Sequence, residues 1–204
     1  MSQPVIYLVR HGETEWNRSR RYQGWSDSPL TARGAAQAEA IGRLLCKIPE
    51  ARSADLVASP LGRARRTAEI IGACLGRTTL LRFDDRLREI SLGSWDGLRH
   101  DEIAAISPGI FEDDYFEWYF RTPDGETYDV FAGRVAAWLA ELGQGPLIVV
   151  THGVVTRVLR GLYAGLPRSD ALRLEVPQDR VFRLAAGTIE EIEVPGSMPS
   201  VRQR

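Results

Sequence analysis

Residues 5–12 have the sequence VIYLVRHG, and this stretch decides the fold. A short apolar run rich in β-branched residues predicts a buried strand over 5–9, and the glycine predicts a loop after it. Open α/β sheets bind their ligands at the carboxyl ends of their strands. We therefore expect Arg10 and His11 to lie in a ligand site.

A second stretch, far along the chain, repeats this arrangement. Residues 147–150, LIVV, predict another buried strand, and Thr151, His152 and Gly153 follow it. The chain has three histidines, and two of them stand at a predicted strand end directly before a glycine. We interpret these two as parts of one site that binds an anion with two imidazoles.

Helical patterns alternate with the predicted strands. Apolar spacing predicts a helix over 31–48, with Thr31 as its N-cap and Pro49 as its end, and a helix over 59–75 opened by Ser59-Pro60. Further helices are expected at 126–142 and 155–164, and further strands at 55–58 and 79–83. The alternation predicts an α/β fold, a three-layer sandwich with a mostly parallel central sheet and helices on both faces.

We expect residues 1–204 to form one domain of the size that its length allows. Near its end, the loose alternation of apolar and polar residues predicts strands at 171–176, 180–186 and 188–194. The polar tail, about 196–204, is expected to be flexible.

The one compositional oddity lies inside a predicted small cap insertion, about 98–123. Residues 110–121 hold six aromatic and four acidic side chains. Two interpretations stay open: the segment covers the site, or its aromatic side chains pack it onto the sheet.

Charge and hydropathy limit the partners. The net charge is −1 and the pI is near 6.3, so there is no basic field that would recruit nucleic acid. No apolar stretch is long enough to span a bilayer, and no secretory signal is present, so we expect no membrane partner and a cytoplasmic protein. The sequence does not decide between a monomer and a homodimer.

Phosphoryl transfer requires a nucleophile, cations for the phosphoryl oxygens and a proton for the leaving oxygen. His11 is the candidate nucleophile, because an uncharged imidazole can attack phosphorus. The alternative is a loop histidine satisfied by a backbone carbonyl. Arg10 and Arg63 are candidate cations, although spacing alone favours Arg63 no more than Arg65 or Arg66.

His152 is a candidate second donor to the phosphate, at the start of a helix; the alternative is a loop residue without a catalytic role. Glu89 is the candidate acid, because a carboxyl group near a phosphate dianion retains its proton and can pass it to the leaving alkoxide. A surface salt bridge with Arg86 or Arg88 is the alternative. His100 lies in a polar stretch and is expected to be structural.

A metal site and a cofactor site are not expected. The chain contains no H-E-x-x-H, no Walker loop and no G-x-G-x-x-G. The substrate we expect is a small-molecule phosphate ester.

Taken together, residues 10–17, RHGETEWN, resemble the signature of the histidine phosphatase superfamily, in its phosphoglycerate mutase-like branch. Residues 22–31, 59–64 and 151–153 resemble further blocks of the same family, and the resemblance extends over roughly 4–194. It implies that His11 is the phosphorylated nucleophile, that Arg10, Arg63 and His152 form the phosphate pocket, and that Glu89 is the proton donor. It also assigns substrate binding to Asn17, Gln23, Gly24 and Gly153.

The resemblance favours a phosphatase over a mutase. Residues 89–97, EISLGSWDG, are similar to the phosphatase members, and the chain is shorter than typical mutases of this type. We therefore expect hydrolysis of a small-metabolite phosphomonoester. The alternatives are a phosphoglycerate mutase that uses the same phosphohistidine, and a binding module without catalysis, which would have to lack the nucleophile or the acid.

Overall fold

The computed structural model describes residues 4–76, 81–112 and 116–195, and its centre is a six-stranded sheet in the order β3-β2-β4-β1-β5-β6. Its strands are β1 (Ile6–Arg10), β2 (Asp55–Ala58), β3 (Leu81–Phe83), β4 (Leu147–Thr151), β5 (Arg180–Ala185) and β6 (Thr188–Glu193). The first four in chain order pair in parallel, whereas β5 runs antiparallel to both of its neighbours. The prediction of an α/β fold with a mostly parallel sheet is confirmed.

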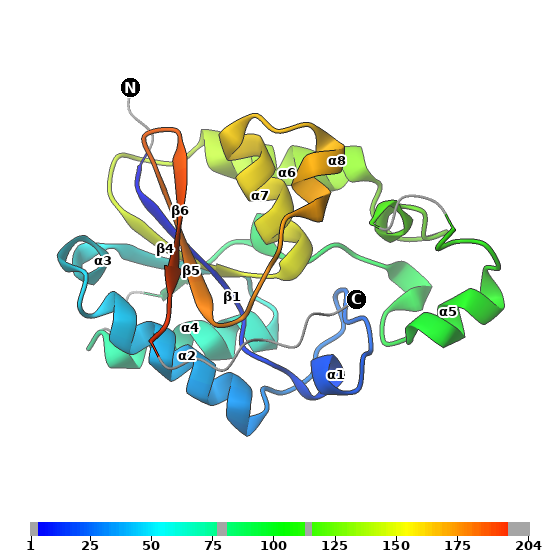
Figure 1. Ribbon diagram of the computed structural model, residues 1–204, viewed down its shortest axis with the longest axis horizontal. Coiled ribbons are helices and arrows are strands. Elements are labelled where there is room, and N and C mark those ends of the chain that lie inside the picture. Colours follow the sequence, from blue (N-terminus) through cyan, green and yellow to red (C-terminus); the bar gives the residue numbers. More distant parts are fainter. Residues whose placement is uncertain (1–3, 77–80, 113–115, 196–204) are drawn as a thin grey trace.

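Helices fill both faces of the sheet (Figure 1). They are α1 (Glu15–Arg18), α2 (Ala32–Leu45), α3 (Pro49–Ser53), α4 (Gly62–Cys74), α5 (His100–Ile106), α6 (Tyr128–Ala140), α7 (Gly153–Ala164) and α8 (Arg168–Arg173). Short 3-10 helices in the described parts of the chain are η1 (Asp85–Leu87), η2 (Gly93–Trp95) and η3 (Glu117–Phe120).

The two faces of the sheet contribute to two separate cores, because side chains alternate along a strand. In β1, Ile6 and Leu8 join the core that contains α6 and α7. Tyr7 and Val9, on the opposite face, join the core that contains α2 and α4. All four side chains are fully buried, so the strand that carries Arg10 is held from both sides.

Two predicted helix boundaries and one predicted element type are wrong. The first predicted helix ends at Leu45, and Pro49 starts α3 instead of ending α2. A proline suits the first turn of a helix because the backbone N–H groups there have no acceptor within the helix, so the N–H that proline lacks costs no hydrogen bond. The helix predicted to open at Ser59-Pro60 begins at Gly62, and its N-cap Leu61 offers no side-chain hydrogen bond.

The third wrong prediction concerns residues 171–176, which are not a strand. Residues 168–173 form α8, which buries Ala171 and Leu172. Gly161 of α7 leaves the space for this contact, since an added Cβ there would lie 2.3 Å from the Cβ of Ala171. A short apolar run cannot by itself distinguish a strand from a helix, and packing against α7 decides here.

The aromatic segment packs onto the core next to α6 and α7. Trp118 is buried in that core, and Phe111 and Phe116 pack against it. The preceding helix, α5, lies away from the sheet (Figure 1). The packing interpretation is therefore confirmed for the described part of this segment, whereas the interpretation that it covers the site stays a prediction. The tail predicted to be flexible, 196–204, lies outside the described residues. Among the described residues, no helix is long and apolar enough to cross a membrane.

The loop after β1 is fixed to α2 by backbone contact. A Cβ added at Gly34 would lie 2.0 Å from the carbonyl oxygen of Glu13, and one at Gly12 would lie 2.2 Å from that of Gly34. The Thr31 N–H also donates to the Glu13 carbonyl, over 2.9 Å. The loop that carries His11 thus lies against the first turn of α2 without intervening side chains.

Gly34→Ala is expected to lower the free energy of unfolding by about 1–3 kcal/mol, because the new methyl group must displace backbone. Gly133→Ala is the matched control: Gly133 is exposed within α6 and a Cβ there meets nothing within 4 Å. We expect it to raise stability by about 0.5–1 kcal/mol. Chemical denaturation of both variants measures the difference, and equal effects would contradict the close contact.

Candidate active site

The paired ends of β1 and β4 bring the two histidines together. Arg10 and Thr151 are partners in the parallel ladder, and the His11 N–H donates to the Thr151 carbonyl over 2.9 Å. The ring centres of His11 and His152 lie 5.2 Å apart. The two imidazoles are therefore neighbours, as expected, and their binding of an anion stays a prediction.

The His11 ring is held so that one nitrogen is free to react. Its Nδ1 lies 2.8 Å from the Gly12 carbonyl oxygen, which can only accept, so Nδ1 carries the ring proton. Nε2 then keeps its lone pair. Burial lowers the pKa of His11 well below its usual value, and the positive charges of Arg63 and Arg10 lower it further. His11 does contact a backbone carbonyl, as the alternative interpretation expected. This contact with Gly12 orients the uncharged imidazole.

In His152, by contrast, it is Nε2 that contacts a hydrogen-bonding group. Its Nε2 lies 2.7 Å from Ser59 Oγ, and that oxygen accepts the Leu61 N–H. Among the described residues the Ser59 hydroxyl proton has no other acceptor, so it points at Nε2 and the imidazole proton lies on Nδ1. Burial, with the charge of Arg63, also lowers the pKa of His152 well below its usual value.

Backbone carbonyls hold the two arginines of the site. Arg63 donates from Nη2 to the Gly24 carbonyl and from Nη1 to the Ser26 carbonyl, each over 2.8 Å, and its Nη1 lies 3.2 Å from Asp27. Arg10 donates from Nη1 to the Val176 carbonyl over 2.7 Å. The structure also decides which arginine of α4 belongs to the site, because Arg63 is buried whereas its neighbours at 65 and 66 are exposed.

Three buried N–H donors remain without a partner in the described parts of the chain: Arg10 Nε, Arg63 Nε and His152 Nδ1. Buried polar groups are nearly always hydrogen-bonded, so unpartnered donors around an uncharged imidazole indicate a ligand. An oxyanion such as phosphate supplies the acceptors that they lack.

Glu89 lies at the start of α7, beside the same pocket. Its carboxylate oxygens accept the backbone N–H groups of Val154, over 3.2 Å, and of Val155, over 3.3 Å. A Cβ added at Gly153 would lie 3.6 Å from Arg10 Nε and 3.7 Å from Glu89 Oε2, so these two groups approach Gly153 from the same side. The helix amides and a cation therefore surround the carboxylate.

The alternative role of Glu89, a surface salt bridge, is wrong. Arg86 pairs with Asp84 and Glu141, and Arg88 pairs with Asp85.

Sequence reasoning missed the residue that fixes the Glu89 backbone. Arg134 of α6 donates from Nη1 to the carbonyls of Arg86 and Arg88, each over 2.7 Å, and from Nη2 to that of Glu89, over 2.9 Å. Its Nε lies 2.8 Å from Glu126. Helical spacing alone marks Arg134 as a polar residue of an amphipathic helix, so no local signal identifies it.

Amide side chains lie next to the loop that carries His11. Asn17 Oδ1 accepts from Gln178 Nε2 over 3.0 Å, and the same nitrogen lies 3.1 Å from the His11 carbonyl oxygen. Gln23 is buried, and its Oε1 has no partner among the residues described. Gln178 and Ser59 were both missed by sequence reasoning, which interpreted Ser59 as a helix cap because a proline follows it.

The two glycines assigned to binding have different positions. Gly24 has a φ of 49° and its carbonyl holds Arg63, and a side chain there would meet the Asp96 carboxylate at 1.7 Å. Gly153 is the first residue of α7 and borders Arg10 and Glu89 directly.

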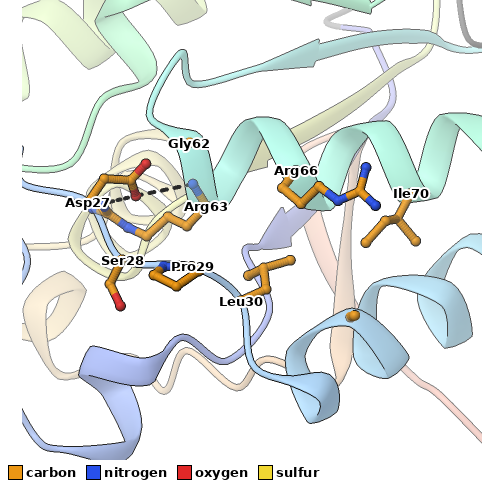
Figure 2. Close-up of a pocket in the computed structure, with 9 residues that line it drawn as sticks. Asp27, Ser28, Pro29, Leu30, Gly62, Arg63, Arg66 and Ile70 are labelled. Atoms are coloured by element: carbon orange, nitrogen blue, oxygen red, sulfur yellow. Dashed lines mark hydrogen bonds and ion pairs between the residues drawn. The ribbon is translucent and has the colours of Figure 1, made fainter.

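A second cavity, of about 530 Å³, is lined in part by Arg63 and lies between residues 27–30 and the first turns of α4 (Figure 2). Apolar side chains of Pro29, Leu30 and Ile70 line it, and neither His11 nor His152 does. The cavity shares Arg63 and Asp27 with the surroundings of the histidine pair, but neither imidazole lines it. No group of three or more His, Cys, Asp or Glu side chains suited to a metal ion occurs in the described regions.

Comparison with known proteins now identifies the family. The model of the histidine phosphatase superfamily, branch 1, matches residues 6–188. The chain belongs to this superfamily. It is 39% identical to the probable phosphoglycerate mutase GpmB of Salmonella arizonae over 196 residues, covering 88% of this chain and 83% of that protein.

Two solved structures of the superfamily are also similar to this chain. YhfR of Bacillus stearothermophilus is 32% identical, with a TM-score of 0.77, covering 96% of this chain and 98% of that one. The mycobacterial glucosyl-3-phosphoglycerate phosphatase in complex with VO3 is 30% identical, with a TM-score of 0.72, covering 93% and 97%. Relatives named as phosphatases and mutases support phosphoryl transfer as the general chemistry of this enzyme.

The depressed pKa of His11 predicts how acid destabilises the fold. The unfolded chain protonates this histidine near pH 6.5, whereas the folded chain keeps it uncharged. Its contribution to stability is therefore complete above pH 6.5 and is lost as the pH falls below that value, by about 1 kcal/mol between pH 6.5 and 5.5. Urea unfolding at both pH values, for the wild type and His11→Asn, measures it. A difference between the two proteins that stays constant with pH would contradict an uncharged His11.

Proposed function

We propose that this enzyme is a metal-independent phosphatase that hydrolyses a small-metabolite phosphomonoester through a phosphohistidine on His11. The observation that carries the proposal is the uncharged His11, with Nε2 unprotonated, beside three buried N–H donors that lack partners in the described chain. This combination provides a nucleophile and a binding site for the group that it attacks.

In the first step His11 Nε2 attacks phosphorus and the bond to the ester oxygen breaks. Arg10, Arg63 and the Nδ1–H of His152 hold the three equatorial oxygens, whose negative charge they offset. Glu89, in its protonated form, gives its proton to the leaving alkoxide. Asn17 and Gln23 add amide groups to the wall of the pocket.

In the second step water attacks the phosphohistidine. Glu89, now a carboxylate, takes the proton of that water, the N–P bond breaks, and inorganic phosphate leaves. Every group in the two steps belongs to the chain itself, so the reaction requires no metal ion and no cofactor.

A mutase is the second candidate, favoured by the identity to the probable phosphoglycerate mutase GpmB. The same phosphohistidine would then return its phosphoryl group to another hydroxyl of the substrate. The two candidates differ in whether water or a substrate hydroxyl receives the group. Incubation with 3-phosphoglycerate and a bisphosphoglycerate separates them: isomerisation that outpaces phosphate release would overturn the phosphatase.

The nucleophile can be tested with p-nitrophenyl phosphate in the presence of EDTA. We expect the wild type to retain its activity, and acid-labile radioactive phosphate to stay on the protein after rapid denaturation. His11→Asn is expected to lose about 10⁴-fold or more in kcat. His100→Gln is the control, because His100 stacks on Phe111 with ring centres 3.8 Å apart, outside the pocket. Loss of activity with EDTA would contradict the proposal.

The role of Glu89 can be tested with two leaving groups. Glu89→Gln cannot give a proton, so kcat for an alkyl phosphate is expected to fall by about 10²–10⁴-fold. p-Nitrophenolate leaves without protonation, and its phosphate ester should lose much less in the phosphorylation step. Rapid-quench measurement of that step decides, and equal losses for both esters would show that Glu89 is not the acid.

A further inference from the structure

Asp96 is a half-buried carboxylate that the proposed reaction does not use. Its Oδ2 accepts the N–H groups of Trp25, over 2.9 Å, and of Ser26, over 3.1 Å, and its Oδ1 accepts that of Leu92, over 3.1 Å. Each of these partners is a backbone amide. Burial raises the pKa of Asp96, and the three amides and the charge of Arg63 counteract the rise. The carboxylate therefore belongs to a fixed arrangement of backbone beside a cation of the site.

A short stretch of chain, residues 24–26, lies between Asp96 and Arg63. Two of its N–H groups donate to the carboxylate. Two of its carbonyls, those of Gly24 and Ser26, accept from the guanidinium, each over 2.8 Å. The stretch thus connects an anion on one side with the cation on the other, and neither side can shift without breaking bonds to it.

The peptide group between Gly24 and Trp25 makes this connection most directly. In a trans peptide the N–H and the C=O point in opposite directions. Asp96 accepts the N–H on one side, and Arg63 donates to the carbonyl oxygen on the other. A peptide whose N–H donates to a carboxylate is polarised, and its carbonyl becomes a stronger acceptor. The carboxylate therefore sets both the direction and the strength of a bond that holds the guanidinium.

Trp25 extends the connection to the proposed acid. Its indole N–H donates to the Glu89 carbonyl over 2.8 Å, while its backbone N–H donates to Asp96. The stretch that Asp96 holds therefore contacts two groups of the proposed reaction, Arg63 through its carbonyls and Glu89 through an indole.

We propose that Asp96 is a positioning residue, which acts through the peptide groups of residues 24–26 to keep the Arg63 guanidinium aligned with the phosphoryl group. The inference rests on the proposed phosphatase function, and it assigns the alignment of a cation to a carboxylate outside the reacting groups. The charge of Asp96 also acts on Arg63 directly. Burial lowers the pKa of Arg63, and the charge of Asp96 is among those that oppose this change.

A simpler role for Asp96 would be to close the turn around η2, through its bond to the Leu92 N–H. That role predicts a loss of stability alone. Positioning of Arg63 predicts weaker binding of an oxyanion by a protein that is still folded.

Asp96→Asn tests the two roles. An amide side chain has one acceptor oxygen, so the variant keeps the size of the side chain but loses the amides on one side. We expect the dissociation constant of orthovanadate, a mimic of the transferring phosphoryl group, to rise about 10-fold, and kcat/KM for p-nitrophenyl phosphate to fall about 10–100-fold. Calorimetric titration and steady-state kinetics measure these changes, and thermal unfolding verifies that the variant is folded at the assay temperature.

Asp124→Asn is the matched control. Its carboxylate lies against Gly93 as that of Asp96 lies against Gly24. It also accepts a backbone amide of the same segment, that of Ser94, but it is exposed and its bonds hold Ser94 instead of residues 24–26. We expect it to keep both quantities within about 2-fold of the wild type.

Arg63→Lys identifies the residue through which Asp96 acts. A lysine keeps the charge but not the fork that holds two carbonyls. If Asp96 acts through this fork, Asp96→Asn in the Arg63→Lys background changes the dissociation constant of orthovanadate by less than about 2-fold, because effects within one network do not add. If Asp96→Asn does not fold, Asp96→Glu replaces it in every measurement, since its extra methylene group displaces the carboxylate from the amides.

The outcomes distinguish this inference from the proposed function. Suppose that the wild type hydrolyses p-nitrophenyl phosphate through a phosphohistidine. The role of Asp96 is then overturned, and the phosphatase stands, if Asp96→Asn binds orthovanadate as the wild type does, or if its effect multiplies with that of Arg63→Lys. If the wild type hydrolyses no ester and forms no phosphohistidine, the proposed function fails, and the positioning role fails with it.

Discussion

The parallel pairing of β1 with β4 is the constraint on which the site depends. It aligns Arg10 with Thr151, and the hydrogen bond from the His11 N–H to the Thr151 carbonyl extends the ladder by one residue into the loops. The ring centres of His11 and His152, which are 141 positions apart in the sequence, thereby lie 5.2 Å from each other. Because both strands are buried on both faces, the backbone that leads to each histidine is packed between two cores.

Burial gives the site its charge pattern. Desolvation keeps both imidazoles uncharged, while the two guanidinium groups remain charged because their pKa starts so much higher. Backbone carbonyls hold most of the outer nitrogens of Arg10 and Arg63, and a carbonyl orients a guanidinium without cancelling its charge. Asp27 lies 3.2 Å from Arg63, and the charge of Glu89 acts on both guanidinium groups.

The first turns of α7 bring several residues of the candidate site together. Its first amides hold Glu89, and its N-cap is His152. The loop after α8 strengthens this arrangement, because three successive carbonyls, of Leu174, Glu175 and Val176, accept from Arg157, Arg160 and Arg10. A segment without regular structure therefore helps to hold these three arginines in place.

The sequence by itself determined what local patterns encode. Apolar runs ended by a glycine located β1 and β4, and the residues that follow them located both histidines, since strand burial and loop placement depend on near neighbours. Tertiary structure alone decided which of three arginines in α4 is buried, that α8 is a helix, and that Ser59 orients His152. Arg134, Gln178 and Arg157 also acquire their positions only there, because each acts on a partner that is distant in the chain and leaves no periodic trace in its own segment.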